Sequence, residues 1–443
     1  MDKRFGGKKF TIMGMDANGR GLKDARFLLQ HGALVLGTDL KKAEELPEAI
    51  ALVKEFPDLT LVLGEHRLED FKNQDYIMRA ALAPINSPYL ALARDNGIPV
   101  VSDETLFLRM APGIRTIGIT GTRGKTTVTY MIYEILKSSS SDSVKQSVFL
   151  GGNVQGTAML PLLDIVKDGD TVVMELDSWK LQSFAENNIS LDVAVFTTFY
   201  RDHMNYYKDS MEDYWNDKSA IFASQSEDDV LILSPQVAEI MEEKDISREY
   251  LLAKEFPKDW RLKLLGEHNR QNAALALYVA RSLGISDEIS RKVLENFNGV
   301  PGRLEYLGEK NGIKYFNDTT ATSPEGVIAA LHALSGYKSK IILMGGGADK
   351  SFEYTTYAEE IKKNVKALVL FKGGASDKVL ALLSDSTIIA GKNITSMAEA
   401  FALAQSIAKT GDVIILSPGA ASFGIFKNEY DRGDQFTRLF KLL

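Results

Sequence analysis

The chain contains no cysteine among its 443 residues. This absence excludes disulfide bonds, thiolate metal ligands and covalent thioester chemistry, and it is compatible with a reducing compartment. No segment approaches the roughly 18 consecutive apolar residues of a spanning helix, and the apolar stretch near the start is too short for the core of a signal peptide. We therefore expect a soluble, cytoplasmic protein with no membrane partner.

An excess of positive charge is also missing. The 52 Lys and Arg residues are outnumbered by 59 Asp and Glu residues, which gives a net charge of −7. A general nucleic-acid binder normally carries a basic face, so we expect no nucleic-acid partner. The length exceeds what a single core usually supports, so the chain should fold as two or three domains.

Short apolar runs rich in β-branched residues alternate with amphipathic stretches from end to end, which is typical of α/β architecture with parallel sheets. The pattern pauses near Ala111-Pro112-Gly113 and again at the turn-rich GVPGR of 299–303. We predict three α/β domains: a Rossmann-like domain over 1–110, a central P-loop ATPase domain with a parallel sheet over 111–300, and a C-terminal Rossmann-like domain over 301–443.

The strongest chemical motif is GITGTRGKTT at 118–127, where a β-run ends in glycines and a helical pattern begins. Glycines let backbone N–H groups converge on phosphate oxygens, and a helix N-terminus adds a positive dipole end. Ile119 stands where strict Walker spacing needs glycine, so the loop is a variant, and a purely structural turn is the alternative. The predicted ATP contacts are Gly121, Thr122, Gly124, Lys125, Thr126 and Thr127.

Three more residues of the central segment are candidates for chemistry. Glu175 and His203 follow apolar runs that read as strands, and ligands gather at the carboxyl ends of strands in open α/β sheets. Lys218 lies in an amphipathic stretch, 208–224, and by itself reads as a solvated lysine. The alternative for Glu175 is an acid at a strand end that faces water, and the alternative for His203 is a structural histidine.

Other polar residues occupy similar settings. Asp39 closes the second apolar run, and the 14–21 turn after the first run is either a nucleotide-diphosphate site or a simple βα turn. Asn272 lies in the first turns of a predicted helix, where the usual role of asparagine is to cap the helix. Arg303 could bind a phosphate group through its bidentate guanidinium or form a surface salt bridge. Asp318, Lys350 and Ser422 belong to the third segment, in turns that follow apolar runs.

Taken in order, these segments resemble the Mur ligase family of peptidoglycan synthesis. The resemblance covers nearly the whole chain and rests on the following motifs: GTRGKTT, Gly151-Gly152-Asn153, the acid of MELDSW, DHM at 202–204, Lys218, GEHNRQN at 266–272, GVPGRLE at 299–305, NDTTAT at 317–322, and SPGAAS followed by FKNEYDRGDQF. It implies an ATP-dependent ligase that activates a carboxylate as an acyl phosphate and condenses it with an amino acid. The chain is most similar to the branch that adds D-glutamate to UDP-N-acetylmuramoyl-L-alanine.

The resemblance also implies residue roles. Lys125 and Thr126 would handle the γ-phosphate and Mg²⁺, with Glu175 as a ligand of that ion. His203 and a carbamylated Lys218 would hold a second Mg²⁺. The remaining implied contacts are Asn272, Arg303 and Asp318 with ATP, Asp39 and the 14–21 turn with the uridine diphosphate, Asn153 with the muramoyl group, and Thr322, Lys350 and Ser422 with D-glutamate. A monomer is expected.

The chain departs from the family pattern at several positions that bear on substrate choice. Asp177 and Lys180 replace the usual serine and glutamine after Glu175, and the other departures are Arg123, Thr320 and Glu429. A sibling ligase with another acceptor and a folylpolyglutamate-type ligase are alternatives, although the latter usually begins near its P-loop. A P-loop ATPase without ligase activity is a third, but it would have no use for Glu175, His203 and Lys218 together.

Overall fold

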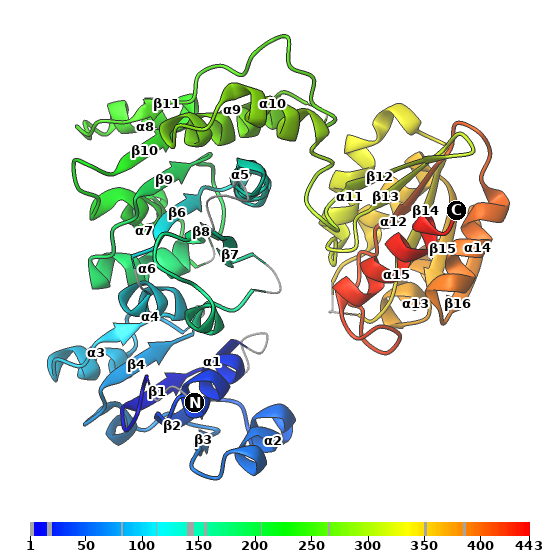
Figure 1. The fold of residues 1–443 in the computed structure, drawn as a ribbon. Coiled ribbons are helices and arrows are strands. Elements are labelled where there is room, and N and C mark those ends of the chain that lie inside the picture. The colour runs from blue at the N-terminus through cyan, green and yellow to red at the C-terminus, as the bar shows by residue number, and fades with distance from the viewer. Residues whose placement is uncertain are drawn as a thin grey trace. The chain divides into compact units, whose positions relative to one another are not determined.

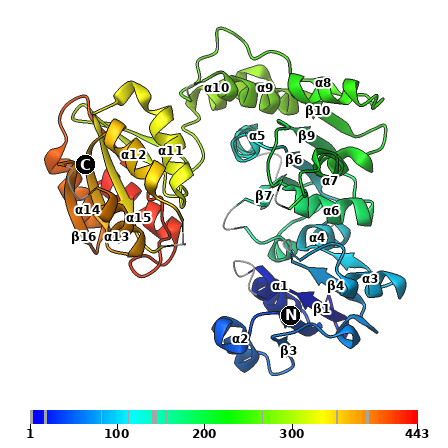
Figure 2. The ribbon, with the colours of Figure 1, turned by 180° about the vertical axis from the view of Figure 1, so that it is seen from behind.

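The computed structural model of the chain describes residues 4–15, 20–80, 83–111, 113–139, 146–154, 157–204, 206–264, 266–349, 352–383 and 387–443. These residues form three sheets flanked by helices (Figures 1 and 2). They divide into two compact units, Met1–Asn296 and Phe297–Leu443, of which the first contains two sheets and the second contains one.

The first sheet is parallel and has the strand order β3-β2-β1-β4-β5. Its strands are β1 (Lys9–Met13), β2 (Leu34–Asp39), β3 (Thr60–Leu63), β4 (Tyr76–Arg79) and β5 (Val100–Val101). Its helices are α1 (Arg20–Gln30), α2 (Pro47–Glu55), α3 (Pro88–Asp95) and α4 (Asp103–Met110). The strand order reverses at β1, so a crevice opens at the carboxyl ends of β1 and β4, where such sheets bind ligands.

The second sheet is also parallel, in the order β11-β10-β9-β6-β8-β7. Its strands are β6 (Arg115–Thr120), β7 (Val148–Gly152), β8 (Thr171–Glu175), β9 (Val193–Phe196), β10 (Val230–Leu233) and β11 (Leu251–Leu252). Its helices are α5 (Lys125–Ser139), α6 (Ser178–Asn187), α7 (Met211–Ala223), α8 (Pro235–Glu243), α9 (Glu267–Ser282) and α10 (Asp287–Asn296). Here β6 lies between β8 and β9, so three strand ends surround the start of α5.

The third sheet has the order β12-β13-β17-β14-β15-β16. Its first two strands, β12 (Glu305–Lys310) and β13 (Ile313–Asn317), are antiparallel, and the rest are parallel: β14 (Ile341–Gly346), β15 (Val365–Phe371), β16 (Ile389–Ile394) and β17 (Val413–Leu416). Its helices are α11 (Pro324–Ala333), α12 (Thr355–Asn364), α13 (Gly374–Leu382), α14 (Met397–Ile407) and α15 (Glu429–Lys441).

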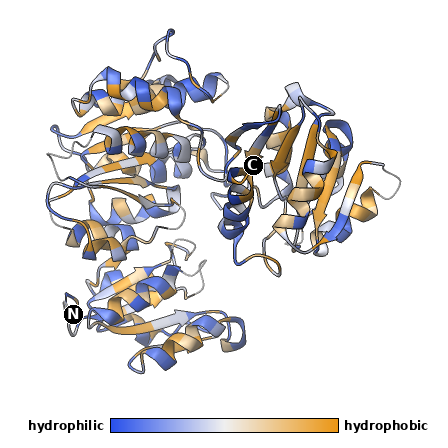
Figure 3. Cartoon of the chain, turned by 45° about the vertical axis from the view of Figure 1, so that its right-hand side comes forward, coloured by the Kyte–Doolittle hydropathy of each residue, from blue (hydrophilic) through white to orange (hydrophobic). Residues whose placement is uncertain are grey.

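Buried parallel strands explain the apolar runs of the sequence, because helices cover both faces of such sheets. Figure 3 shows the central strands in hydrophobic orange and polar blue on outward helix surfaces. One hydrophobic core extends from the first sheet into the second, joining residues such as Phe10 and Leu28 to Leu160 and Phe196. Two further cores lie within the third unit.

The predicted α/β class is confirmed, and several predicted elements match closely. The β-run that leads into the phosphate-loop motif is Arg115–Thr120, the helical pattern after it begins at Lys125, and the amphipathic stretch 208–224 contains Met211–Ala223. Each sheet falls within one predicted domain, but the boundaries near 110 and 300 stay predictions. Among the described residues, no helix is both long and apolar enough to cross a membrane.

A buried arginine holds two loops of the third unit together. Arg432, on α15, is 0% exposed. Its guanidinium donates to the carbonyl and hydroxyl oxygens of Thr319 at 2.9 and 3.1 Å and to the carbonyl of Ala420 at 3.3 Å. Burial lowers the pKa of Arg432 to about 10. The segments after β13 and β17 are therefore joined through one side chain.

Replacing Arg432 with leucine should lower the free energy of unfolding of this unit by about 3 kcal/mol, because buried acceptors lose their donor. All 3 tryptophans precede residue 297, so tryptophan fluorescence reports only on the first unit. In a urea titration of Arg432→Leu, circular dichroism should show a transition at a lower urea concentration than in the unmodified chain, because the second unit unfolds earlier. The tryptophan fluorescence transition of the first unit should occur at the same urea concentration in both proteins. The exposed Arg438→Leu on the same helix is the matched control, and an equal shift in both variants would contradict this role for Arg432.

Candidate active site

The phosphate-loop segment connects β6 to α5, as the motif predicted. Gly121 has φ +141°, and a Cβ atom built on it would lie 2.1 Å from Thr197 Oγ1. The loop backbone is held by the end of β9, because Thr122 N donates to the Thr198 carbonyl at 2.7 Å and Arg123 N donates to Thr198 Oγ1 at 2.9 Å. Glycine at 121 is thus required by close contact with a neighbouring strand end.

Two lysine ammonium groups converge on one carbonyl of this loop. Lys125 Nζ donates to the Gly121 carbonyl at 3.0 Å and to the Thr122 carbonyl at 3.2 Å. Lys218 Nζ, from α7, donates to the same Gly121 carbonyl at 2.9 Å. The amphipathic pattern by itself predicts a solvated Lys218, but its side chain is buried, at 2% exposed.

The environment of Lys218 opposes its positive charge. Burial first, and then the charge of the neighbouring Lys125, lower the pKa of Lys218 to about 7. The ammonium also lies 4.9 Å from the ring centre of Tyr214. Two cations in a poorly solvated site repel each other, so an anion between them would be strongly favoured.

Glu175 and His203 lie at or after the ends of the two strands that flank β6. Glu175 closes β8, pairs in register with Ile119 of β6 and is 5% exposed. His203 follows β9 with φ +56°, and its ring lies 4.6 Å from that of Trp179, centre to centre. Burial, together with Lys218 and Lys125, lowers the pKa of His203, which favours the neutral imidazole that can bind a metal.

The donor set around the loop suits a hard divalent cation bound with phosphate. The predicted ligands comprise one carboxylate, one hydroxyl, one imidazole and one modified lysine. Among the residues that the structure describes, no three of His, Cys, Asp and Glu gather as a complete metal-binding group. Mg²⁺ is usually held by one or two carboxylates plus substrate phosphates and water, and Glu175 and Thr126 carry oxygen donors of that kind.

Asn272 reaches the phosphate loop from α9. A Cβ atom on Gly124, which has φ +87°, would lie 2.5 Å from Asn272 Oδ1. The Asn272 amide nitrogen donates to Asn269 Oδ1 at 3.3 Å. The structure therefore brings Asn272 against the loop, in addition to Lys125, Glu175, His203 and Lys218.

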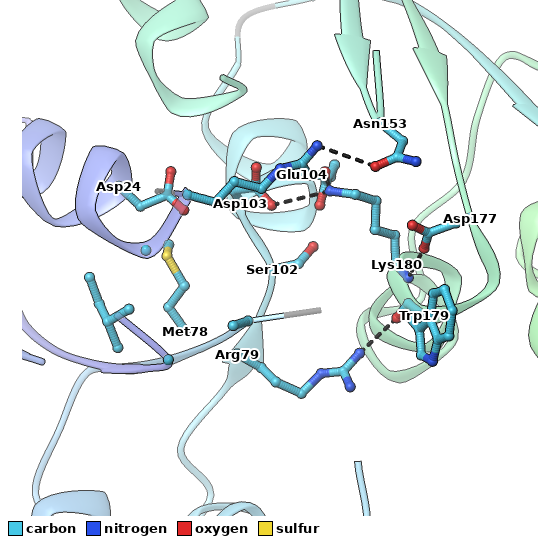
Figure 4. Close-up of a pocket in the computed structure, with 15 residues that line it drawn as sticks. Asp24, Met78, Arg79, Ser102, Asp103, Glu104, Asn153, Asp177, Trp179 and Lys180 are labelled. Carbon is cyan, nitrogen blue, oxygen red and sulfur yellow. Dashed lines mark hydrogen bonds and ion pairs between the residues drawn. The ribbon is translucent and has the colours of Figure 1, made fainter. Parts of the chain in front are cut away.

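A cavity of about 190 Å³ lies within the first unit, at the crevice of the first sheet (Figure 4). Gly14, Arg79 and Asn153 line it, together with the first turn of α4 and the start of α6. Arg20 donates to Asn153 Oδ1 at 3.3 Å, so the predicted muramoyl contact faces the βα turn. Part of that turn, 16–19, lies outside the described residues.

Asp39 supports the same turn from the end of β2. Its carboxylate accepts hydrogen bonds from Met15 N at 2.7 Å and from Lys41 N at 2.9 Å. The predicted uridine contact is thus already engaged with backbone, and it orders the turn whether or not it also meets a ligand.

In the second unit, the predicted residues follow β13 and β17. Asp318 accepts from Ser417 Oγ at 2.6 Å and from Leu304 N at 2.9 Å, and burial raises its pKa to about 7. It thereby fixes the loop that carries the exposed Arg303. Thr322 follows in the same segment.

Ser422 is buried after β17 and next to Ala421, which pairs with Ala348 through mutual backbone hydrogen bonds of 3.1 Å. Lys350 lies outside the described residues.

Sequence reasoning missed several residues that build the site. Thr197 and Thr198 hold the phosphate loop, and their position after an apolar run was a usable indication. Tyr214 packs against Lys218, and its hydroxyl lies 3.3 Å from Thr122 Oγ1. Arg20 and Glu104 line the cavity. Arg20 falls within the predicted 14–21 turn, whereas nothing in the sequence singled out Glu104.

Two family models match the chain: the Mur ligase middle domain over residues 119–255 and the Mur ligase, glutamate ligase domain over residues 302–419. The chain is 33% identical to the UDP-N-acetylmuramoylalanine–D-glutamate ligase of Roseiflexus sp. (strain RS-1), with 98% of each chain covered. It is 32% identical to the ligase of the same name from Borreliella afzelii (strain PKo), again with 98% of each covered.

Solved structures share the fold at lower identity. A UDP-N-acetylmuramate–alanine ligase of Thermotoga maritima is 18% identical with a TM-score of 0.54, covering 98% of this chain and 99% of that one. A folylpolyglutamate synthase of Thermotoga maritima is 17% identical with a TM-score of 0.56, covering 75% of this chain and 92% of that one. The first of these matches, which spans nearly the whole chain, supports the three-sheet architecture.

The contact between Gly121 and β9 yields a direct test. Gly121→Ala should weaken binding of a non-hydrolysable ATP analogue with Mg²⁺ at least tenfold. The added methyl group would strain the backbone of the phosphate loop by about 1–3 kcal/mol and displace the N–H groups that bind phosphate. Isothermal titration calorimetry measures this. Gly284→Ala is the control, since Gly284 has φ +74° but nothing within 4 Å of its added Cβ. Unchanged binding by Gly121→Ala would contradict the contact argument.

Proposed function

Because the chain belongs to the Mur ligase family, we propose that it couples ATP cleavage to amide formation between UDP-N-acetylmuramoyl-L-alanine and D-glutamate. The protein is an ATP-dependent acid–amino-acid ligase, and the substrates are those named by its full-length relatives. The observation that carries the proposal is the pair of lysines on the Gly121 carbonyl, with Glu175 at the adjacent strand end. The reaction belongs to cytoplasmic peptidoglycan precursor synthesis, and we propose that the enzyme acts as a monomer.

The proposed chemistry has two steps. The alanyl carboxylate attacks the γ-phosphorus of ATP, the bond to ADP breaks, and an acyl phosphate forms. The amine of D-glutamate then attacks the acyl carbon, and the tetrahedral intermediate expels phosphate and loses a proton. Positioning and neutralisation of charge account for most catalysis of phosphoryl transfer. Lys125 would contribute a cation to the phosphates from its position on the loop.

Mg²⁺ would supply further neutralisation of the phosphate charge, and this chain's donors fit two ions. Thr126 and Glu175 would hold one of them. His203, with its neutral imidazole favoured, would hold the other together with Lys218.

Carbamylation of Lys218 follows from its surroundings. The Lys218 ammonium first loses a proton, and the neutral amine nitrogen attacks CO₂. A nitrogen–carbon bond forms and a second proton leaves, so an anion replaces the original cation. A buried ammonium beside Lys125 is costly, whereas a carbamate in the same position would attract Lys125 and a metal. The burial of Lys218 and the positive charge of Lys125 together support the proposed carbamylation.

The substrate contacts are also proposals. Asn272, Arg303 and Asp318 would hold ATP, and Asn153 would contact the muramoyl group. Asp39 would order the turn that receives the uridine diphosphate. Thr322 and Ser422, with Lys350 from outside the described residues, would orient D-glutamate.

Phosphate release from ATP tests the reaction. We expect release only when both UDP-N-acetylmuramoyl-L-alanine and D-glutamate are present, because each is needed for turnover. A panel of other amino acids with radiolabelled nucleotide sugar identifies the acceptor. Release with ATP alone would favour a free-standing ATPase, and product formation with a different amino acid would favour a sibling ligase.

Lys218→Ala should remove most of the activity, and added short-chain carboxylic acids should restore part of it by replacing the carbamate. The measurement is phosphate release with all three substrates, with and without acid. The exposed Lys258→Ala serves as control and should show neither effect. Full activity of Lys218→Ala would remove this lysine from the mechanism.

A further inference from the structure

The segment that begins at His203 has an unusual backbone. His203, Lys208 and Asp209 have φ of +56°, +46° and +66°, in a region that residues other than glycine seldom adopt. Such conformations cost free energy and persist only where the surrounding contacts hold them. His203 is one of the residues proposed above to bind a second Mg²⁺, so the following inference, which concerns the contacts that hold it, rests on the proposed function.

Backbone hydrogen bonds close a tight turn at this point. The His203 carbonyl oxygen accepts from Tyr206 N at 2.9 Å and from Tyr207 N at 3.1 Å. The Tyr207 side chain is buried, at 5% exposed, and its ring centre lies 4.9 Å from that of Tyr214 on α7. Because Tyr207 is bonded to His203 and is itself fixed by packing, it anchors this segment, which we call the His203 turn.

A single carboxylate oxygen holds the anchor. Asp217 Oδ2 accepts from the Tyr207 hydroxyl at 2.8 Å and from Gln182 Nε2 at 2.6 Å. Gln182 Nε2 also lies 3.2 Å from the Tyr206 hydroxyl, to which it donates. Gln182 belongs to α6 and Asp217 to α7, so these bonds join two helices to the His203 turn.

The position of Asp217 on α7 gives these bonds a second consequence. Asp217 immediately precedes Lys218, the lysine proposed to complete the same metal site. Consecutive residues of a helix point about 100° apart, so one side chain can reach the His203 turn while the next reaches the phosphate loop. Asp217 meets Tyr207, and Lys218 meets the Gly121 carbonyl. One rigid helix therefore carries one proposed ligand and the support of the other.

An aromatic contact restrains the imidazole but does not replace this support. The ring centres of Trp179 and His203 lie 4.6 Å apart, and Trp179 meets Tyr206 edge to face at 5.6 Å. Ring packing limits the tilt of the imidazole, whereas the hydrogen bonds determine where the backbone of His203 lies. The alternative interpretation is that Asp217 only satisfies two donors and stabilises the fold, and the two interpretations differ in their consequence for metal binding.

We propose that Asp217 is a positioning residue for the second metal ion, because through Tyr207 it sets the place of His203 relative to Lys218. It acts by accepting hydrogen bonds and not by touching the ion. Altering residues that orient metal ligands in this way typically costs about 10–100-fold in metal affinity or activity.

Tyr207→Phe and Asp217→Ala each break the link, the first by removing only a hydroxyl group. The full chain is given Mn²⁺ in place of Mg²⁺, bicarbonate, a non-hydrolysable ATP analogue and UDP-N-acetylmuramoyl-L-alanine, and electron paramagnetic resonance counts the bound ions without turnover. In both variants we expect the affinity for the second Mn²⁺ to fall about tenfold or more. The affinities for the first Mn²⁺ and for the analogue should not change, because Lys125, Thr126 and Glu175 are untouched.

Steady-state kinetics gives a second measurement. In both variants kcat should fall about tenfold while the KM for ATP changes less than about twofold, since the contacts to the nucleotide stay in place. Asp217→Asn keeps an acceptor oxygen at the same position and should retain most of the affinity for the second ion. A loss in Asp217→Asn as large as that in Asp217→Ala would contradict positioning through hydrogen bonds.

Tyr250→Phe is the matched control. It also removes a tyrosine hydroxyl next to a carboxylate of the first unit, that of Glu242 at 3.5 Å, but away from the His203 turn. We expect it to bind both ions as the unmodified chain does. If Asp217→Ala does not fold, Tyr207→Phe carries the test, because it preserves the packing of the ring.

The outcomes separate this inference from the proposed reaction. Two Mn²⁺ ions bound equally well by the unmodified chain and by Tyr207→Phe would overturn the positioning role alone. Equal loss of both ions would overturn it as well, because it would indicate a general structural role. A single Mn²⁺ in the unmodified chain would overturn the two-ion part of the proposed function and this inference with it, whatever the phosphate-release assay shows.

Discussion

The central constraint of this structure is electrostatic: Lys125 and Lys218 donate to the same carbonyl oxygen, that of Gly121. Because Lys218 is buried and a carbonyl oxygen carries no formal charge, an anion at this point would stabilise the two lysines. The supporting features follow from this geometry. Gly121 must have positive φ to approach β9, and α7 must pack deeply enough to bury Lys218.

The parallel sheets determine where this charge is placed. In the second sheet the loop after β6 lies between the ends of β8 and β9, which bring Glu175 and the threonines at 197 and 198 to it. In the first sheet the reversal at β1 opens the cavity beside Asn153. The phosphate loop and the cavity of the first unit thus both arise at strand-order reversals, where open α/β sheets bind ligands.

Much of the fold and part of the site could be predicted from the sequence, for identifiable reasons. Apolar runs predicted the strands, and GKTT predicted the loop, because a local backbone requirement leaves a local pattern. Lys218 could be assigned only through family resemblance, since its burial depends on the packing of α7 against a distant loop. Glu104 and Arg432 left no pattern at all. Their partners are separated from them by as many as 113 residues, a distance across which periodicity carries no information.

The continuous core shared by the first two sheets has an evolutionary consequence. Phe10 and Leu28 belong to the same cluster as Leu160 and Phe196, and the pairs Arg94–Glu186 and Arg79–Trp179 connect the same two layers. A recombination event that exchanged residues 1–110 alone would mismatch this shared packing and leave the Trp179 carbonyl and the Glu186 carboxylate without their arginine donors. The first two sheets should therefore be inherited together, and new nucleotide-sugar preferences should emerge through substitutions lining the seam instead of through replacement of a whole module.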